Sequence, residues 1–458
     1  MRLLSVRAVL LTVLTLLLTF GLAAFVVQYF DHAATWVEHP SNSHFYKEGK
    51  LHSLGTVYDR SGKILLSMEE GSIKYNEDAA VRTALMHITG DRDNNVETAV
   101  PIAFRSRLMG WNLLNGAYRF HSGRFNPGQE LNLTLDADLC TTAYRELGGR
   151  KGAVGVYNYR TGEIICAATA PSFDPLAPPD FDRSPGQYEG VFLNRLFSAA
   201  YTPGSVFKLV TAAAALDHLP GAEDTLFNCS GKMQINNSEI SCLAEHGEVT
   251  LKEALARSCN VAFAQVALEL GAERLQEYAE KAGFNTALKV DGIYAVAGRI
   301  NLAHAGKAEL GWAGAGQFTT TANPLSLMAY VGAIGNRGLQ VTPRTVADRN
   351  LLSRADLKAK KRVLSEDTAA TLGQMMRNNT LAVYGEGNFQ GLELCAKSGT
   401  AEVGQGEKPH AWFTGFLARE DLPLAFVVVI EGGGSGSESA AAVASKVLQA
   451  AANAAKVE

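Results

Sequence analysis

Apolar and polar residues are arranged differently in successive parts of this chain, and the first part is a long uncharged run. Residues 8–30 carry no charge and are mostly apolar, whereas Arg2 and Arg7 precede them and Asp31 follows them. A helix over this run would be about 34 Å long, which exceeds the roughly 30 Å hydrocarbon core of a bilayer. The pattern therefore predicts a membrane-spanning helix at the amino end.

A cleavable signal peptide is the alternative interpretation of this run. The small residues Ala23 and Ala24 suit a cleavage site, but the apolar part of a signal peptide is usually only about 7–15 residues long. We therefore expect residues 1–34 to form a cytoplasmic tip and an uncleaved anchor. Because basic residues lie before the run, the amino terminus is expected in the cytoplasm and the rest of the chain outside.

Residues 35–129 have a mixed pattern, which predicts a small separate region before the main domain. Its clearest feature is residues 56–66, which alternate as two short strands around the turn-forming sequence Asp-Arg-Ser-Gly at residues 59–62. Residues 91–95 form a charged loop.

From residue 130 the pattern becomes regular. Strand-like alternation and helical spacing follow one another. The expected strands are residues 131–135, 153–157, 163–167, 412–417 and 425–430, and the expected helices include residues 138–147, 206–213, 251–257 and 440–455. Strands at both ends with helices between them predict one α+β domain over residues 130–458, with a sheet that gathers distant segments.

Composition narrows the classes of function. Hydrophobic residues make up 47% of the chain and charged residues 19%, so a large core is feasible. The net charge of -4 argues against a broad nucleic-acid-binding surface, so we expect no nucleic-acid partner. The chain has no C-x-x-C pair and no H-E-x-x-H sequence, so we expect no metal and no cofactor.

Export gives the cysteines a specific interpretation. Cys229 and Cys242 bracket a short polar segment with the turn signals of a hairpin, so their side chains could meet as a disulfide; two ordinary thiols are the alternative. His246 is expected to have a structural place in a turn. The other cysteines have apolar neighbours and are expected in the core. They are Cys140, Cys166, Cys259 and Cys395.

The strongest local signal for chemistry is the sequence Pro-Gly-Ser-Val-Phe-Lys at residues 203–208. Proline and glycine before an apolar-periodic run mark the start of a helix, which places Ser205 and Lys208 on one face of its first turn. A serine hydroxyl needs a nearby base to become a nucleophile, and a buried neutral lysine can be that base. A surface Ser and Lys on an ordinary helix is the alternative.

Two further motifs gain meaning only beside the first. Ser258 and Asn260, which follow a helical pattern, could relay a proton and bind a substrate amide, although a helix cap is the default for such a tripeptide. Lys397, Ser398 and Gly399 lie on a predicted strand. The main-chain amides of Thr400 and Ser205 could together stabilise an oxyanion.

In this order the motifs S-x-x-K, S-x-N and K-S-G resemble the signature of the penicillin-binding proteins and class A β-lactamases. Cys259 stands at the variable middle position of S-x-N, and Ser398 replaces a threonine but keeps its hydroxyl. The resemblance covers roughly residues 130–458. It extends over residues 151–156, 161–167, 171–175, 194–195, 201–205, 246–250, 316–324 and 410–416.

The region before this domain is similar to class B members, which are monofunctional transpeptidases. Residues 55–62, Gly-Thr-Val-Tyr-Asp-Arg-Ser-Gly, resemble their R-G-x-I-x-D-R-N-G segment, although Leu54 stands where arginine is usual. The chain leaves no room for a glycosyltransferase domain, so a bifunctional enzyme is not expected. The implied fold is an antiparallel sheet flanked by helices, with a helical subdomain.

The resemblance implies a mechanism. Ser205 attacks the penultimate D-alanine of a peptidoglycan stem peptide, with Lys208 as base, and the amides of Ser205 and Thr400 hold the oxyanion. Ser258 with Lys397 protonates the departing D-alanine. The residues implied to bind the donor stem peptide are Asn260, Ser398, Gly399 and Thr400. A neighbouring stem peptide then completes the cross-link, and β-lactams acylate Ser205 in place of the substrate.

Other functions share these motifs. A D,D-carboxypeptidase would use water as acceptor, a β-lactamase or β-lactam sensor would need fast deacylation or a signalling membrane domain, and a cell-wall scaffold would not need an intact triad. The single anchor and the intact chemical groups favour the transpeptidase. The resemblance also implies the cytoplasmic membrane as location and a polytopic glycan polymerase of an elongation or division complex as partner.

Overall fold

The computed structural model describes most of the chain. The described residues are 2–37, 39, 46–47, 50–51, 54–69, 72–110, 120–121, 124–125, 128–347, 360–404 and 406–456.

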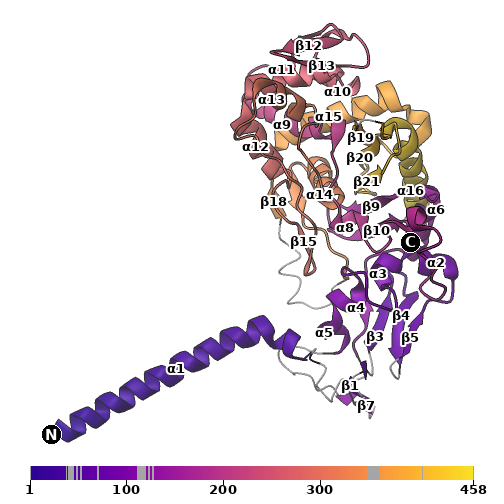
Figure 1. The fold of residues 1–458 in the computed structure, drawn as a ribbon. Coiled ribbons are helices and arrows are strands. Elements are labelled where there is room, and N and C mark those ends of the chain that lie inside the picture. Colours follow the sequence, from indigo (N-terminus) through magenta and orange to yellow (C-terminus); the bar gives the residue numbers. More distant parts are fainter. Residues whose placement is uncertain are drawn as a thin grey trace. The chain divides into compact units, whose positions relative to one another are not determined.

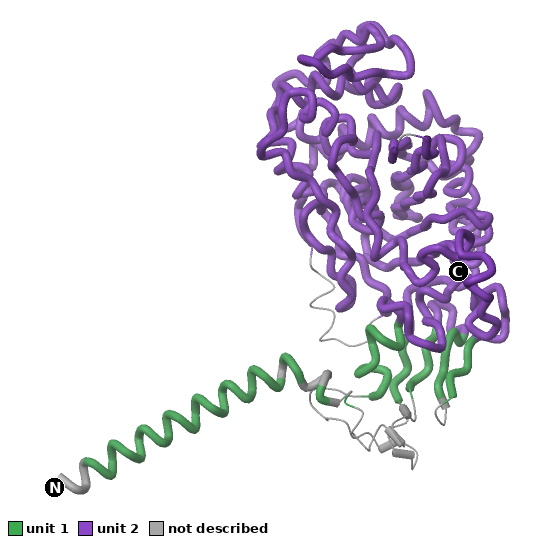
Figure 2. The backbone as a smooth tube through the Cα atoms, viewed as in Figure 1, with its two compact units in different colours: residues 1–58, 64–75, 100–131 green, residues 59–63, 76–99, 132–458 purple. Residues whose placement is uncertain are grey.

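The described chain forms two compact units that interleave along the sequence (Figure 2). The N-terminal unit contains Met1–Tyr58, Ile64–Tyr75 and Val100–Leu131, and the C-terminal unit contains Asp59–Lys63, Asn76–Ala99 and Asn132–Glu458. The linear division at residues 34 and 129 stays a prediction.

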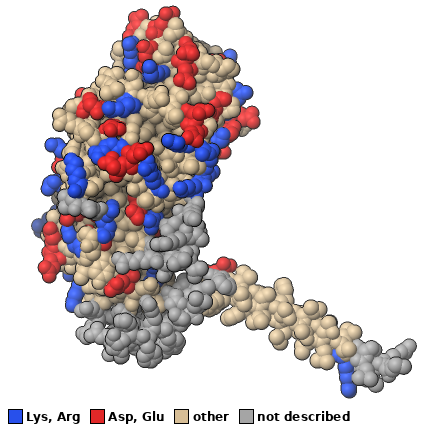
Figure 3. All heavy atoms as spheres, turned by 180° about the vertical axis from the view of Figure 1, so that it is seen from behind, with Lys and Arg blue, Asp and Glu red and all other residues tan. Residues whose placement is uncertain are grey.

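The first helix, α1 (Arg2–Val37), has the properties expected of a membrane anchor. Within it, Val6–Tyr29 is long and apolar enough to cross a bilayer, the one such helix among the described residues. Its few polar side chains are satisfied locally, since the hydroxyls of Thr12 and Thr15 donate to the carbonyls four residues earlier. Figure 3 shows uncharged side chains along most of this helix, whereas basic and acidic side chains intermingle on the visible face of the C-terminal unit.

The N-terminal unit is built around a four-stranded sheet of order β5-β4-β3-β8. The predicted strand pair is β3 (Leu54–Tyr58) and β4 (Ile64–Glu69), which is confirmed. β8 (Leu131–Asn132) is shorter than the strand expected over residues 131–135. The other elements of this unit are β1 (Tyr46–Lys47), β2 (Lys50–Leu51), β5 (Ser72–Tyr75), α4 (Val100–Ala103), α5 (Arg105–Leu108), β6 (Phe120–His121) and β7 (Arg124–Phe125).

The C-terminal unit is organised by a five-stranded antiparallel sheet of order β10-β9-β21-β20-β19 (Figure 1). Its strands come from both ends of the unit, as the sequence predicted. They are β9 (Gly152–Asn158), β10 (Ile164–Ala170), β19 (Leu394–Ala401), β20 (His410–Leu417) and β21 (Leu424–Ile430). Nearly all of their side chains are buried because helices cover both faces.

Helices on opposite faces complete the predicted α+β architecture. α6 (Ala137–Leu147) and α16 (Ala441–Ala454) pack against one face of the sheet. The other face is covered by α8 (Arg195–Ser198), α14 (Pro324–Gly335) and α15 (Glu366–Asn379). Tyr157 of β9 reaches this second layer and donates its hydroxyl to the carbonyl of Ala329.

A helical subdomain adjoins the sheet on the side of α15 (Figure 1). Its central helix α9 (Lys208–His218) is buried over its first eight residues. The surrounding helices are α10 (Leu251–Ala256), α11 (Asn260–Leu270), α12 (Ala272–Lys281) and α13 (Lys307–Gly314). The predicted hairpin is confirmed as β12 (Lys232–Ile235) paired with β13 (Ser238–Ser241).

The remaining elements of the C-terminal unit are short. They are α2 (Ala79–Ala84), α3 (Met86–Thr89), α7 (Pro185–Tyr188), η1 (Gly204–Phe207), β11 (Phe227–Cys229), β14 (Gly247–Val249), β15 (Lys289–Val290), β16 (Ile293–Tyr294), β17 (Leu339–Val341), β18 (Lys360–Arg362), η3 (Thr380–Tyr384), η4 (Glu386–Phe389) and η5 (Gly436–Ala440).

Candidate active site

Ser205 lies in a tight turn at the start of a buried helix. The sequence predicted the first turn of an α-helix, whereas the structure forms the 3₁₀ turn η1, after which α9 begins at Lys208. Gly204 has a φ of 55°, and a Cβ atom there would lie 2.7 Å from the carbonyl oxygen of Thr400. Only glycine allows this turn to approach the edge strand so closely.

Lys208 is completely buried and points at the Ser205 hydroxyl. Its Nζ lies 2.8 Å from Ser205 Oγ, 2.8 Å from the Ser258 carbonyl oxygen and 2.7 Å from Asn260 Oδ1. Burial lowers the pKa of Lys208 to about 7, because desolvation penalises the charged ammonium. A substantial neutral fraction near neutral pH would leave a lone pair for a proton from Ser205.

The S-x-N motif follows α10, as the sequence predicted, and its last residue, Asn260, begins α11. Ser258 has a φ of 56°, in the left-handed region, and this conformation directs its hydroxyl between two lysines. Ser258 Oγ is 3.2 Å from Lys208 Nζ and 3.1 Å from Lys397 Nζ. The side-chain amide of Asn260 is held in place, because its Nδ2 donates one hydrogen bond to the carbonyl of Ser241. The structure therefore brings all three motifs into one cluster.

Lys397 on β19 is the second completely buried lysine of this cluster. It donates to Ser258 Oγ and to the carbonyl oxygen of Ser398 at 2.8 Å. Burial and the charge of Lys208 hold the pKa of Lys397 well below its usual range. Two adjacent buried ammonium groups repel each other, so a proton shared among Lys208, Lys397 and Ser258 is favoured over two full charges.

β19 forms the edge of the sheet beside Ser205. Ser398 is held by Tyr384, whose hydroxyl donates to Ser398 Oγ at 3.0 Å and accepts the Ser398 N–H at 2.8 Å. A Cβ atom at Gly399 would lie 2.8 Å from the carbonyl oxygen of Pro203, so glycine is needed here as well. Thr400 is exposed. The open edge offers main-chain groups to an extended peptide.

Several residues in segments that carry the resemblance position the site, although their roles were not predicted from the sequence. Trp412 Nε1 donates to the carbonyl oxygen of Thr202, just before the serine turn, at 3.0 Å. Arg195 donates to Glu431 at 2.7 Å, and Tyr201 donates to the same carboxylate at 2.8 Å. These partners lie more than 200 positions apart in the sequence. The spacing of residues within one helix or strand cannot predict contacts between residues so far apart in the sequence.

The predicted Cys229–Cys242 disulfide is not formed in the structure. The two Sγ atoms lie 3.8 Å apart, and all six cysteines are free. Cys259, expected as an ordinary core residue, lies with its Sγ 3.7 Å from Cys242 Sγ. His246, expected to have a structural place in a turn, points its Nδ1 at Cys229 Sγ. These four residues are the one group among the described side chains that could hold a metal ion.

Comparison with known families agrees with the geometry of the site. Residues 152–449 match the family described as the penicillin binding protein transpeptidase domain. This segment contains Ser205, Lys208, Ser258, Asn260 and residues 397–400.

Individual relatives support the same assignment. Peptidoglycan D,D-transpeptidase PbpA of Mycolicibacterium smegmatis is 30% identical over 370 residues, which cover 74% of each chain. The D,D-transpeptidase domain of a peptidoglycan glycosyltransferase from Eggerthella lenta matches with a TM-score of 0.73 and 25% identity, over 89% of this chain and 100% of that one.

A third comparison concerns the fold alone. Penicillin-binding protein A from M. tuberculosis, solved as a ceftriaxone acyl-enzyme, matches with a TM-score of 0.74 and 23% identity, over 87% of this chain and 98% of that one. Together with the family match, these relatives identify the chain as a class B penicillin-binding protein of the transpeptidase family.

Proposed function

We propose that this chain is a peptidoglycan D,D-transpeptidase that works through an acyl-enzyme on Ser205. The observation that carries the proposal is the 2.8 Å contact between Ser205 Oγ and the completely buried Nζ of Lys208. A lysine that is easily deprotonated beside a serine on a tight helix start is suited to generate an alkoxide.

In the first step Lys208 accepts the hydroxyl proton as Ser205 Oγ attacks the carbonyl carbon of the penultimate D-alanine. The carbonyl oxygen becomes an oxyanion in the space between η1 and β19. The main-chain N–H groups of Ser205 and Thr400 stabilise this charge, because preformed donors need no reorganisation during the reaction.

Collapse of this intermediate breaks the peptide bond and releases the terminal D-alanine. Its nitrogen needs a proton, which Ser258 supplies because its Oγ contacts both Lys208 and Lys397. The proton that Ser205 lost to Lys208 thus returns through Ser258 to the leaving amine, and the carbonyl stays bonded to Ser205 as an ester.

The donor stem peptide lies along the free edge of β19. Ser398 and Thr400 provide side-chain hydroxyls, and Gly399 keeps the strand close to the serine turn. A cavity of about 300 Å³ beyond the end of β19, lined in part by Trp312, Phe318 and Glu402, gives room for the remainder of the donor. Asn260 orients Lys208 through its Oδ1 and donates one Nδ2 hydrogen to Ser241, and the second Nδ2 hydrogen can bind the amide of the donor peptide.

The amine of a neighbouring stem peptide then attacks the ester and forms the cross-link. A β-lactam enters the same site and leaves Ser205 acylated. A D,D-carboxypeptidase would transfer the acyl group to water instead. The relatives named as peptidoglycan D,D-transpeptidases favour the amine acceptor.

The proposed location of this reaction is outside the cytoplasmic membrane, with the amino terminus inside, and the apolar helix α1 supports it as a candidate single-pass anchor. Arg2 and Arg7 precede its apolar stretch, which is the orientation favoured for basic residues on the cytoplasmic side. A polytopic glycan polymerase in the same membrane is the expected partner, since it would supply nascent glycan strands to the transpeptidase.

The decisive experiment is labelling of the full-length protein in detergent with a fluorescent penicillin, followed by intact-mass analysis. We expect one adduct on the wild type and none on Ser205→Ala. Ser184→Ala is the matched control, because the side chain of Ser184 makes no capping hydrogen bond at α7. An adduct that persists in Ser205→Ala would refute the nucleophile. Incubation with a donor and an acceptor stem peptide then distinguishes cross-linking from hydrolysis.

A further inference from the structure

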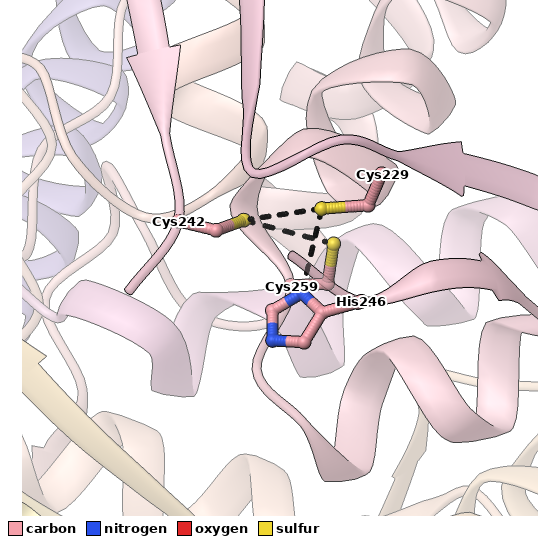
Figure 4. A group of neighbouring side chains, drawn as sticks. All are labelled: Cys229, Cys242, His246 and Cys259. Carbon is pink, nitrogen blue, oxygen red and sulfur yellow. Dashed lines mark hydrogen bonds between the residues drawn. The ribbon is translucent and has the colours of Figure 1, made fainter. Parts of the chain in front are cut away.

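Three cysteines and one histidine converge beside the active site. Figure 4 shows their side chains pointing toward one another from four separate segments of the helical subdomain. Cys229 ends β11, Cys242 follows β13, His246 precedes β14, and Cys259 caps the amino end of α11. Cys229 and Cys259 are fully buried, whereas Cys242 and His246 are partly exposed.

The spacing of the four ligand atoms is compatible with tetrahedral coordination of one metal ion. The Sγ atoms of Cys229 and Cys242 are 3.8 Å apart, those of Cys242 and Cys259 are 3.7 Å apart, and Cys229 Sγ is 3.4 Å from His246 Nδ1. All four atoms lie within 4.8 Å of one another. With metal–sulfur bonds of about 2.3 Å, tetrahedral geometry places two sulfurs about 3.8 Å apart.

We propose that Cys229, Cys242, His246 and Cys259 bind one structural Zn²⁺ ion that holds the S-x-N motif in place. Thiolate and imidazole donors in a four-coordinate arrangement suit zinc, and a site filled by four protein ligands leaves no open position for catalysis. The net charge of three thiolates and Zn²⁺ is −1, which a buried site must compensate by hydrogen bonds.

The helix start around Cys259 provides that compensation. Main-chain N–H groups of Asn260 and Val261 donate to Cys242 Sγ at 3.1 and 3.4 Å, and that of Ala262 donates to Cys259 Sγ at 3.3 Å. Donors of this kind stabilise thiolate charge and orient metal ligands.

A disulfide explains these contacts less well. A bond between Cys229 and Cys242 requires sulfurs about 2.05 Å apart and would leave Cys259 and His246 without a role. Main-chain hydrogen bonds also hold the segments that carry these side chains together. The His246 N–H donates to the Cys229 carbonyl, and the Cys242 N–H donates to the Gly231 carbonyl. These two hydrogen bonds keep the β12–β13 hairpin and the segment before β14 close to the proposed metal position.

The ion would affect catalysis only by holding Ser258 and Asn260 in position. Cys259 lies between Ser258 and Asn260, and Asn260 Nδ2 donates to Ser241, the neighbour of Cys242. The metal would therefore tie both the backbone and the carboxamide of the motif to the hairpin. Cys259 and its partners are positioning residues, because none of them touches the reacting atoms.

The test begins with metal content and thiol counting on the full-length protein purified without chelators. We expect about one zinc per chain, released when a mercurial blocks the thiols, and tetrahedral thiolate-type absorption bands after exchange with Co²⁺. After denaturation in a chelator, all six cysteines should alkylate without a reductant. Absence of zinc together with two thiols that alkylate only after reduction would establish the disulfide and overturn the proposal.

Variants separate the metal from the chemistry of the active site. Cys229→Ser should lower zinc affinity at least about tenfold and slow penicillin acylation about 10- to 100-fold, because Ser258 and Asn260 lose their support. Cys140→Ala is the matched control: Cys140 is an equally buried free cysteine outside the cluster, and its loss should leave zinc content unchanged. If Cys229→Ser fails to fold, the zinc content and the cobalt spectrum of the wild type still test whether the four residues bind a metal ion.

A protein that acylates normally but contains no zinc and has six free thiols would refute this inference and leave the transpeptidase assignment intact. Conversely, zinc in a protein that penicillin does not label would support the site and count against the proposed nucleophile.

Discussion

Lys208 and Lys397, which are 189 positions apart in the sequence, bring their ammonium nitrogens to within 3.2 and 3.1 Å of the same atom, Ser258 Oγ. Both side chains are completely buried. Burial lowers the pKa of each lysine, and the charge of Lys208 lowers that of Lys397 further. This arrangement of groups from a helix, a loop and a strand supports the proposed role of Lys208 as a base at neutral pH.

The first prediction concerns the pH dependence of acylation. The pKa of Lys208 is about 7, so the neutral lysine that accepts the Ser205 proton becomes more abundant as the pH rises through that value. The acylation rate constant for a fluorescent penicillin should rise about tenfold per pH unit below pH 7 and level off above it. Stopped-flow measurements between about pH 5.5 and 8.5 test this. Lys208→Arg, which keeps the charge, should be slow throughout, and a flat wild-type profile would rule out Lys208 as the base.

The second prediction concerns Tyr384, which makes two hydrogen bonds to Ser398. Tyr384→Phe removes both and loosens the edge strand beside the substrate. We expect acylation to slow about 5- to 15-fold, equivalent to about 1–1.5 kcal/mol. Tyr144→Phe is the control, since the Tyr144 hydroxyl makes only a 3.4 Å contact with the Ser172 carbonyl. Equal rates for the two variants would show that Ser398 needs no support from Tyr384.

The third prediction concerns stability in acid. His87 is buried, and its Nε2 lies 2.7 Å from the Val191 carbonyl, whereas its Nδ1 has no partner among the described residues. Burial lowers its pKa from 6.5 to about 4. Between these values the unfolded state binds a proton that the folded state excludes, so stability is lost as the pH falls. The loss should reach about 3 kcal/mol near pH 4.

Urea unfolding of wild type and His87→Gln at about pH 7.5 and 4.5 measures this contribution. Glutamine can still donate to the Val191 carbonyl but does not titrate. The variant should therefore lose less stability on acidification than the wild type. The same pH dependence in both proteins would assign acid sensitivity to other groups.

The fourth prediction concerns Arg195, whose side chain is 3% exposed and donates to Glu431. Glu431→Ala leaves this guanidinium buried without its carboxylate, which should cost about 3 kcal/mol and lower the melting temperature by several degrees. Glu189→Ala removes a carboxylate that is 75% exposed and should change the melting temperature little. Differential scanning calorimetry compares them, and equal melting temperatures would show that Arg195 finds other partners.

The three motifs that form the candidate site could be located in the sequence because each is local. Ser205 and Lys208 lie one helical turn apart, and residues 397–400 share one strand, so their side-chain directions follow from helix and strand geometry. The apolar helix at the amino end was predictable for the same reason, because an uncharged run long enough to cross the hydrocarbon core of a bilayer is typical of a membrane anchor. The hairpin between Cys229 and Cys242 also followed from its turn residues.

Only the tertiary structure decided which distant side chains meet. Tyr384 reaches Ser398 through the packing of the segment after α15 against β19, and Arg195 of α8 reaches Glu431, which directly follows β21. The cysteines show the same limit. Spacing suggested a pair, but Cys259 and His246 join Cys229 and Cys242 because α11 and β14 pack around the hairpin. Such contacts have no period along the chain, since they depend on how helices and strands pack and not on how each one forms.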